Sequence, residues 1–106
     1  MKTFDEYQQE TMKTAVYDKD VAVTYLALGL ASEAGEVAGK VKKWVRGDTS
    51  YVDTDDIAKE LGDVLWYVSQ MAETFNLSLG DIAQANVDKL RSRMERDKIK
   101  GDGDNR

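Results

Sequence analysis

The sequence contains no cysteine, no histidine and no proline in its 106 residues. Without cysteine there can be no disulfides, thiolate metal sites or cysteine nucleophiles. Without histidine there can be no Ser-His-Asp catalysis and no histidine-ligated zinc. Any catalysis must therefore use carboxylates, Lys, Arg, Tyr, Ser or Thr. The absence of proline, together with abundant Ala, Glu, Lys and Leu, favours a helical protein.

The charge and the distribution of apolar residues exclude further classes. A net charge of −5 argues against binding nucleic acid through its phosphates. The N-terminus has no apolar signal region, and no uninterrupted apolar run approaches the ~18 residues of a membrane span. We therefore expect a cytoplasmic protein whose partners include neither nucleic acid nor a membrane. Its length predicts a single domain over residues 1–100 and a mobile tail over 101–106.

Apolar residues at helical spacing and capping residues predict four helices and no strand. The expected helices cover about 3–17, 21–46, 54–75 and 79–98. The fold class is all-α, and short connections favour an antiparallel four-helix bundle. In the last helix, four apolar residues are expected to be buried. These are Ala83, Val87, Leu90 and Met94. The residues expected to begin or end helices are Thr3, Gly47, Asp53, Asn76 and Ser78.

Two pairs of acids stand out on the second and third helices. Glu33 and Glu36 lie in an otherwise apolar stretch, and Glu60 and Asp63 repeat the same i, i+3 spacing. Each pair therefore shares one face of its helix. Since the two helices are joined by a short loop, they should be antiparallel neighbours, with the pairs at similar distances from the loop. We expect the four carboxylates to converge.

Four clustered carboxylates repel one another strongly unless a cation binds between them. Oxygen ligands without His or Cys favour Mg²⁺, with Mn²⁺ or Ca²⁺ as alternatives. Gly35 and Gly62 lie beside the acids in mid-helix, where glycine allows another helix, a metal-bound water or a substrate to approach the backbone. One such acid pair alone would be typical of a solvated helix face.

Basic and aromatic residues accompany the acids. Lys89 and Arg93 border the apolar face of the last helix, where they could bind a polyphosphate or simply cover the core with their methylenes. Tyr67, Trp44 and Tyr25 could stack on a base, although aromatic residues at helical spacing are more often core. Trp66 points away from the apolar stripe, so we interpret it as a subunit contact rather than a site residue.

The acid motifs and their flanks resemble the MazG-like nucleotide pyrophosphohydrolases of the all-α NTP pyrophosphatase superfamily. The family pattern, E-x-x-E followed by E-x-x-D, reads here as 33–36 and 60–63, within the blocks SEAGEV and KELGDVLWYV. The pattern N-x-x-K-L-x-x-R at 86–93 and the ending KIKGDGDNR are also similar to the family. The resemblance extends from about residue 26 onward and implies a MazG-like helical fold.

The resemblance implies hydrolysis of nucleoside triphosphates, in particular deoxynucleoside triphosphates, to a nucleoside monophosphate and pyrophosphate. Glu33, Glu36, Glu60 and Asp63 would be the catalytic residues and the ligands of Mg²⁺, and the protein would be a homodimer or homotetramer. The implied substrate-binding residues are Lys40, Tyr67, Asn86, Lys89 and Arg93.

Two alternatives remain open at this point. The chain could be a non-catalytic helical interaction module, whose acids form the polar seam of a dimer without metal. It could also be a metal-dependent phosphohydrolase that cuts a phosphomonoester or a phosphodiester. Base and sugar specificity, the number of metal ions and the choice between dimer and tetramer are left open as well.

Overall fold

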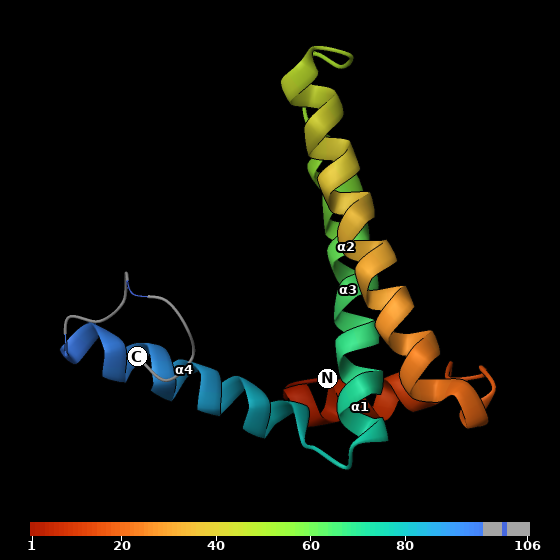
Figure 1. Ribbon diagram of the computed structural model, residues 1–106, viewed down its shortest axis with the longest axis vertical. Helices are drawn as coiled ribbons and strands as arrows, with labels where there is room; N and C mark the ends of the chain where they lie inside the picture. Colours follow the sequence, from red (N-terminus) through yellow and green to blue (C-terminus); the bar gives the residue numbers. More distant parts are fainter. Residues whose placement is uncertain (97–100, 102–106) are drawn as a thin grey trace.

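Two long helices form an antiparallel hairpin that is the main body of the chain. The computed structural model describes residues 1–96 and 101, and the described part contains helices and turns but no strand. Helix α2 (Ala22–Arg46) and helix α3 (Thr54–Thr74) run side by side in opposite directions (Figure 1). The expectations of an all-α fold and of antiparallel second and third helices are therefore confirmed.

The ends of these two helices follow the predicted capping residues. Gly47 ends α2 at φ 93°, and the amide of the next residue donates to the carbonyl of Lys43 over 2.9 Å. Asn76 follows α3 at φ 57°, and the amide of the next residue donates to the carbonyl of Ala72 over 2.8 Å. Both residues adopt the left-handed backbone conformation that commonly ends an α-helix, and glycine and asparagine are favoured in that position. Asp53 caps the start of α3.

The first helix, α1 (Phe4–Met12), is shorter than the predicted 3–17. Its start is as expected, because the hydroxyl of Thr3 accepts from the amide of Glu6 over 3.0 Å. Its end is earlier because residues 13–18 form a connector that packs on other elements. Within this connector the hydroxyl of Tyr17 donates to Oε1 of Gln70 over 2.7 Å. The short helix η1 (Lys19–Val21) then leads into α2.

Polar side chains occupy the contact between α1 and α3. The hydroxyls of Thr11 and Ser69 lie 3.1 Å apart, and the side-chain amide of Gln70 donates to Thr11 over 2.9 Å. All three residues are buried. Since buried polar atoms cost free energy unless they are hydrogen-bonded, these bonds fix how α1 lies on α3.

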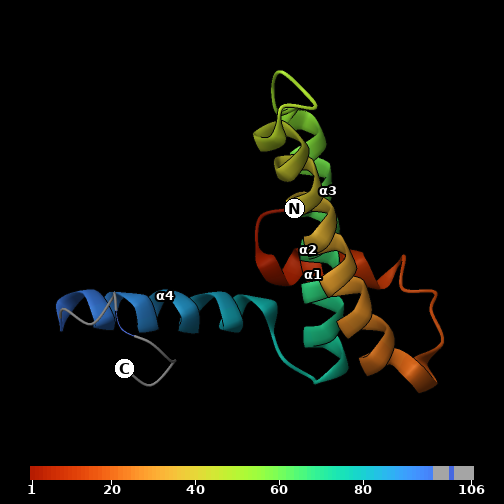
Figure 2. The same ribbon diagram turned by 45° about the horizontal axis from the view of Figure 1, so that its top comes forward.

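Helix α4 (Leu79–Glu95) is attached to α1 at a hydrogen-bonded corner. Oδ1 of Asp5 accepts from the hydroxyl of Ser78 over 2.8 Å and from the amide of Gly80 over 3.0 Å. Oε1 of Gln8 accepts from the amide of Leu79 over 2.8 Å. From this corner α4 leads away from the α2–α3 hairpin in both views (Figures 1 and 2). The corner therefore sets the direction of α4.

The expected four-helix bundle is not closed within one chain. Helices α2 and α4 make no contact, and the radius of gyration is 16.5 Å, whereas a compact domain of this length has about 13 Å. Three of the apolar residues that we expected to be buried in α4 are exposed: Val87 by 44%, Leu90 by 39% and Met94 by 66%. The physical reason is the α1–α4 corner, which points this face away from the hairpin.

Two expectations fall wholly or mainly outside the described residues. These are the end of the last helix near Lys98 and, apart from Gly101, the mobile tail over 101–106.

The helical stretch Lys19–Arg46 is long and apolar enough to cross a membrane by length and composition alone. That stretch packs along α3 and carries Glu33 and Glu36 at its middle.

Candidate functional site

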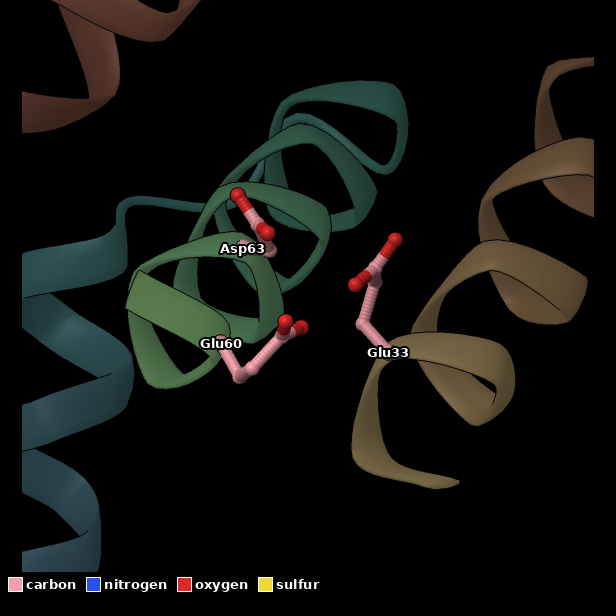
Figure 3. Close-up of side chains that lie close together, drawn as sticks. All are labelled: Glu33, Glu60 and Asp63. Carbon is pink, nitrogen blue, oxygen red and sulfur yellow. The ribbon is translucent and has the colours of Figure 1, made fainter. Parts of the chain in front are cut away.

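Three acids from the two long helices meet between them. Glu33 projects from α2 toward Glu60 and Asp63 of α3 (Figure 3). One carboxylate oxygen from each of the three residues lies within 4.8 Å of the others. Glu33 and Glu60 are half-buried, and Asp63 is exposed. The antiparallel hairpin therefore brings together three of the four acids that the sequence singled out.

The carboxylate of Glu33 lies in an unfavourable environment for its negative charge. Partial burial between the helices raises its pKa above the usual 4.5, and the charges of Asp63 and Glu60 raise that pKa further. A cation placed between these oxygens would remove the repulsion.

Lys40, one of the implied substrate-binding residues, lies beside the cluster but already has carboxylate partners. Its Nζ is 3.0 Å from Oδ2 of Asp56 and 3.9 Å from Oε1 of Glu60. The hydrogen bond from Lys40 lowers the pKa of Asp56. Sequence analysis missed Asp56, although it lies one helical turn before Glu60 on the same face of α3.

Glu36 and the two nearby glycines differ from their expected positions. Glu36 is exposed and lies outside the close group of three acids, although its charge contributes to the raised pKa of Glu33. A Cβ atom added to Gly35 or Gly62 would meet nothing within 4 Å. No helix of the described chain approaches the backbone there. Room for a water or a substrate remains.

The close approach of the two helices occurs instead at Gly29. A Cβ atom added there would lie 2.1 Å from Cε1 of Tyr67, so the tyrosine ring rests on the backbone of α2. The hydroxyls of Tyr25 and Tyr67 lie 3.5 Å apart. This pairing, with partial burial, raises the pKa of Tyr67 to about 12. Tyr67 therefore remains protonated at neutral pH, beside the acids.

A cavity of about 330 Å³ opens next to two of the acids. It is lined by Thr14, Glu33, Asp63, Trp66 and Tyr67. We interpreted Trp66 as a subunit contact rather than a site residue, but the structure places its indole beside the acids, where its Nε1 donates to Oγ1 of Thr14 in the 13–18 connector over 2.8 Å. Thr14 could not be recognised as a site residue from the sequence, because the predicted first helix extended through this position.

The aromatic residues around this cavity contact one another. Trp66 and Tyr67 meet edge to face with ring centroids 5.0 Å apart, and Tyr17 meets Trp66 edge to face at 6.1 Å. Tyr17 also stacks on Tyr25 at 5.3 Å. Such contacts hold aromatic rings in fixed orientations. One side of the acid cluster is therefore a preformed aromatic wall.

The remaining candidate residues lie on α4 and are not brought to the acids of their own chain. These residues are Asn86, Lys89 and Arg93. Helix α4 makes no contact with α2, which carries Glu33, and it leads away from the hairpin (Figure 2). A role for them at this cluster requires α4 of another copy of the chain.

The donor set of the cluster fits a hard divalent cation. It offers three carboxylate oxygens at close range, drawn from two helices and partly shielded from solvent. Mg²⁺ is bound in proteins through carboxylates while keeping several waters, and an open cavity beside Glu33 and Asp63 leaves room for them. Zinc and copper prefer imidazole or thiolate, which this chain lacks.

Comparison with known proteins identifies the family to which the chain is similar. A model of the MazG nucleotide pyrophosphohydrolase domain matches residues 22–96. The Gene 37 protein of Mycobacterium phage L5 is 42% identical over 111 residues, covering 96% of this chain and 97% of that protein. No solved structure matches the chain. The matched domain contains the acids, Lys40 and Tyr67, whereas α1 and the 13–18 connector precede it.

Proposed function

Because the chain belongs to the MazG nucleotide pyrophosphohydrolase family, we propose that it hydrolyses nucleoside triphosphates, in particular deoxynucleoside triphosphates, between the α- and β-phosphates. Water supplies the new oxygen on one phosphorus and the bridging P–O bond breaks. The products are a nucleoside monophosphate and pyrophosphate. The observation that supports this most is the convergence of Glu33, Glu60 and Asp63 within 4.8 Å.

The proposed metal ligands are these three acids and Glu36. MazG proteins are typically metal-dependent, and bound Mg²⁺, or Mn²⁺ in its place, would neutralise phosphate charge and activate water. Glu36 is exposed and one turn from Glu33, so a change of rotamer could bring it to the same ion or to a second one. One of the four acids would accept the proton of the attacking water.

The remaining residues would bind the substrate. We assign the phosphates to Lys40, Lys89 and Arg93, and a phosphate or the sugar to Asn86. Tyr67, next to the acids, would contact the nucleoside. Since α4 does not reach the acids of its own chain, Asn86, Lys89 and Arg93 would act at the site of a second copy.

A homodimer or homotetramer is therefore part of the proposal. Exposed apolar side chains support it: Leu28 of α2 is 67% exposed and Leu61 of α3 is 53% exposed. Isolated exposed apolar residues are normal, but α2 carries several, among them Val23, Val41 and Val45, and together they mark an interaction surface. MazG-like enzymes are soluble, and we place this one in the cytoplasm with small nucleotides, and neither nucleic acid nor membrane, as its partners.

The test measures pyrophosphate release from ribo- and deoxynucleoside triphosphates, with Mg²⁺ and with EDTA, and identifies the nucleotide product. Magnesium-dependent pyrophosphate with a monophosphate is the expected result. Inorganic phosphate with a diphosphate would mean that a different bond is cut. No turnover with Mg²⁺ or Mn²⁺ would favour the interaction module, and a melting temperature that does not rise with Mg²⁺ would support that conclusion.

A further inference from the structure

The cavity beside Glu33 and Asp63 has one polar wall that lies outside the matched domain. Thr14 lies in the connector between α1 and η1, ahead of residues 22–96. The cavity has a volume of about 330 Å³, which is at the lower end of the range for small-molecule sites. If the acids hold the metal and the phosphates, this adjoining cavity is where the nucleoside would lie.

The hydrogen bonds of Thr14 leave its hydroxyl with acceptor capacity only. Oγ1 donates its proton to the carbonyl of Thr11 over 3.2 Å, and it accepts from Nε1 of Trp66 over 2.8 Å. A threonine hydroxyl has one proton and two lone pairs, so one lone pair is left over. The indole N–H, which is a donor only, is also used. The Thr14–Trp66 pair therefore offers a ligand an acceptor and no donor.

The other fixed polar groups of the cavity point to the same preference. Glu33 and Asp63, which we assign to the metal, have no proton to donate when ionised and so offer the base no donor. The hydroxyl of Tyr67 can donate or accept and does not discriminate. A ligand group that donates would pair with Thr14, whereas a carbonyl oxygen would face another acceptor and remain unpaired. Unpaired polar groups in a binding site are penalised, which is how such sites reject close analogues.

Trp66 and Tyr67 supply the apolar part of the cavity. Their rings meet edge to face at 5.0 Å and are fixed by Tyr17 and Gly29. Any nucleobase can stack on such rings, so the aromatic residues would add affinity without selecting one base over another. Selection among the bases then depends on the hydrogen-bonding groups of the cavity, in particular the hydroxyl of Thr14.

We propose that this cavity binds the nucleobase and that Thr14 selects bases with an amino group at C4 of a pyrimidine or at C6 of a purine. These are cytosine and adenine, which carry an amino group where uracil, thymine and guanine carry an oxygen. The proposal rests on the proposed function, because it takes the ligand to be a nucleotide. It makes Thr14, which lies outside the matched domain, the specificity-determining residue.

Binding of the product nucleotides tests the proposal without requiring turnover. The full chain with Trp44→Phe leaves Trp66 as its single tryptophan, whose fluorescence should respond when a base stacks in the cavity. We expect dCMP to bind about tenfold more tightly than dUMP, since the two differ only in the amino or oxo group. Thr14→Val, which keeps the shape and removes the acceptor, should bring the two affinities together.

Two matched variants complete the design. Thr14→Ser keeps the hydroxyl and should keep the preference for dCMP. Thr74→Val removes a hydroxyl with a similar backbone bond, to the carbonyl of Gln70, far along α3 from the acids, and should change nothing. Equal binding of dCMP and dUMP by the parent, or a preference that survives Thr14→Val, would overturn the proposal.

Assays with dCTP and dUTP separate this proposal from the proposed function. Magnesium-dependent release of pyrophosphate from both at equal kcat/KM would overturn the selection by Thr14 and leave the reaction intact. Selective binding of dCMP without turnover of any triphosphate would overturn the reaction and support the cavity assignment.

Discussion

At the scale of single residues, the acids of the site oppose folding in the absence of metal. Glu33 lies partly buried among like charges, and its pKa is raised for that reason. A carboxylate in this position weakens the folded state and strengthens cation binding, since the repulsion disappears when a cation is bound. Function and metal-free stability should therefore respond in opposite directions when one of these acids is neutralised.

Asp63→Asn and Glu36→Gln should abolish turnover without destabilising the metal-free fold. We expect kcat to fall at least about 100-fold, because a bound metal supplies several kcal/mol to such reactions. The melting temperature in EDTA should be equal to or above that of the parent, and its rise with Mg²⁺ should be reduced. The control is Glu10→Gln on α1, an exposed acid whose carboxylate pairs with Lys13. A metal-free variant that unfolds would contradict this account.

Gly29→Ala should destabilise the protein, because its Cβ would lie 2.1 Å from the ring of Tyr67. We expect a loss of about 1–3 kcal/mol in the free energy of unfolding, as for other overpacked sites, and weaker nucleotide binding because Tyr67 moves. Denaturant unfolding measures the first effect. Gly39→Ala is the control, since nothing lies within 4 Å of its added Cβ. It should raise stability by about 0.5–1 kcal/mol.

The sequence predicted most of the acid cluster and little of its surroundings. Helical spacing was enough to place Glu33, Glu60 and Asp63 together, because the short loop after Gly47 permits only an antiparallel partner. The cavity could not be predicted, because it depends on a non-helical connector at Thr14. Local propensity favoured a helix there, and contacts distant in the sequence decided otherwise.

At the scale of helices, the caps were predictable and the packing directions were not. Side chains of Thr3, Asp53 and Ser78 bond to amides two or three residues ahead, so their signal is local. The direction of α4 depends on Asp5 and Gln8, which lie more than 70 positions from their partners. A periodic apolar pattern shows which face is apolar but not what covers it.

Asp5→Asn should weaken the corner between α1 and α4 in a pH-dependent way. The amide of Gly80 and the hydroxyl of Ser78 lower the pKa of Asp5 below its usual 3.8. The ionised group therefore contributes stability above the unfolded-state pKa of 3.8, and this contribution is lost as the pH falls through the lower, folded-state pKa. The melting-temperature gap between parent and variant should be largest above about pH 4 and should close in more acidic buffer.

The control for this measurement is Asp81→Asn, in the first turn of the same helix. It tests whether any acid near the start of α4 would behave in the same way through the helix dipole. A gap for Asp5→Asn that stays constant down to the lowest pH would show that the carboxylate is not what holds the corner.

At the scale of the whole molecule, one chain leaves apolar surface exposed on three helices. Leu28, Leu61 and Met94 belong to α2, α3 and α4, and each is more than half exposed. A chain with so open a shape should depend on its copies for stability. Light scattering should give the mass of a dimer or tetramer, and the melting temperature should rise with protein concentration.

Mixing two inactive variants tests whether α4 acts on another copy. Glu33→Gln removes an acid, and the double variant Lys89→Ala, Arg93→Ala removes the cations of α4. If each site combines the acids of one chain with α4 of another, subunit exchange between the two in a dimer should restore about a quarter of the parent activity. If all of these residues act within one chain, the mixture should remain inactive even after exchange is shown by mass spectrometry.

The corner at Asp5 and Gln8 also makes α4 a lever. The helix has 17 residues, so at about 1.5 Å per residue its arm is about 25 Å long. A swing of about 10° at the corner would carry the far end through about 4 Å, which is enough to make or break a contact with phosphate. Small adjustments where α1 meets α4 would thus be magnified at Lys89 and Arg93. Sequence changes in the first ten residues could tune catalysis without touching the acids.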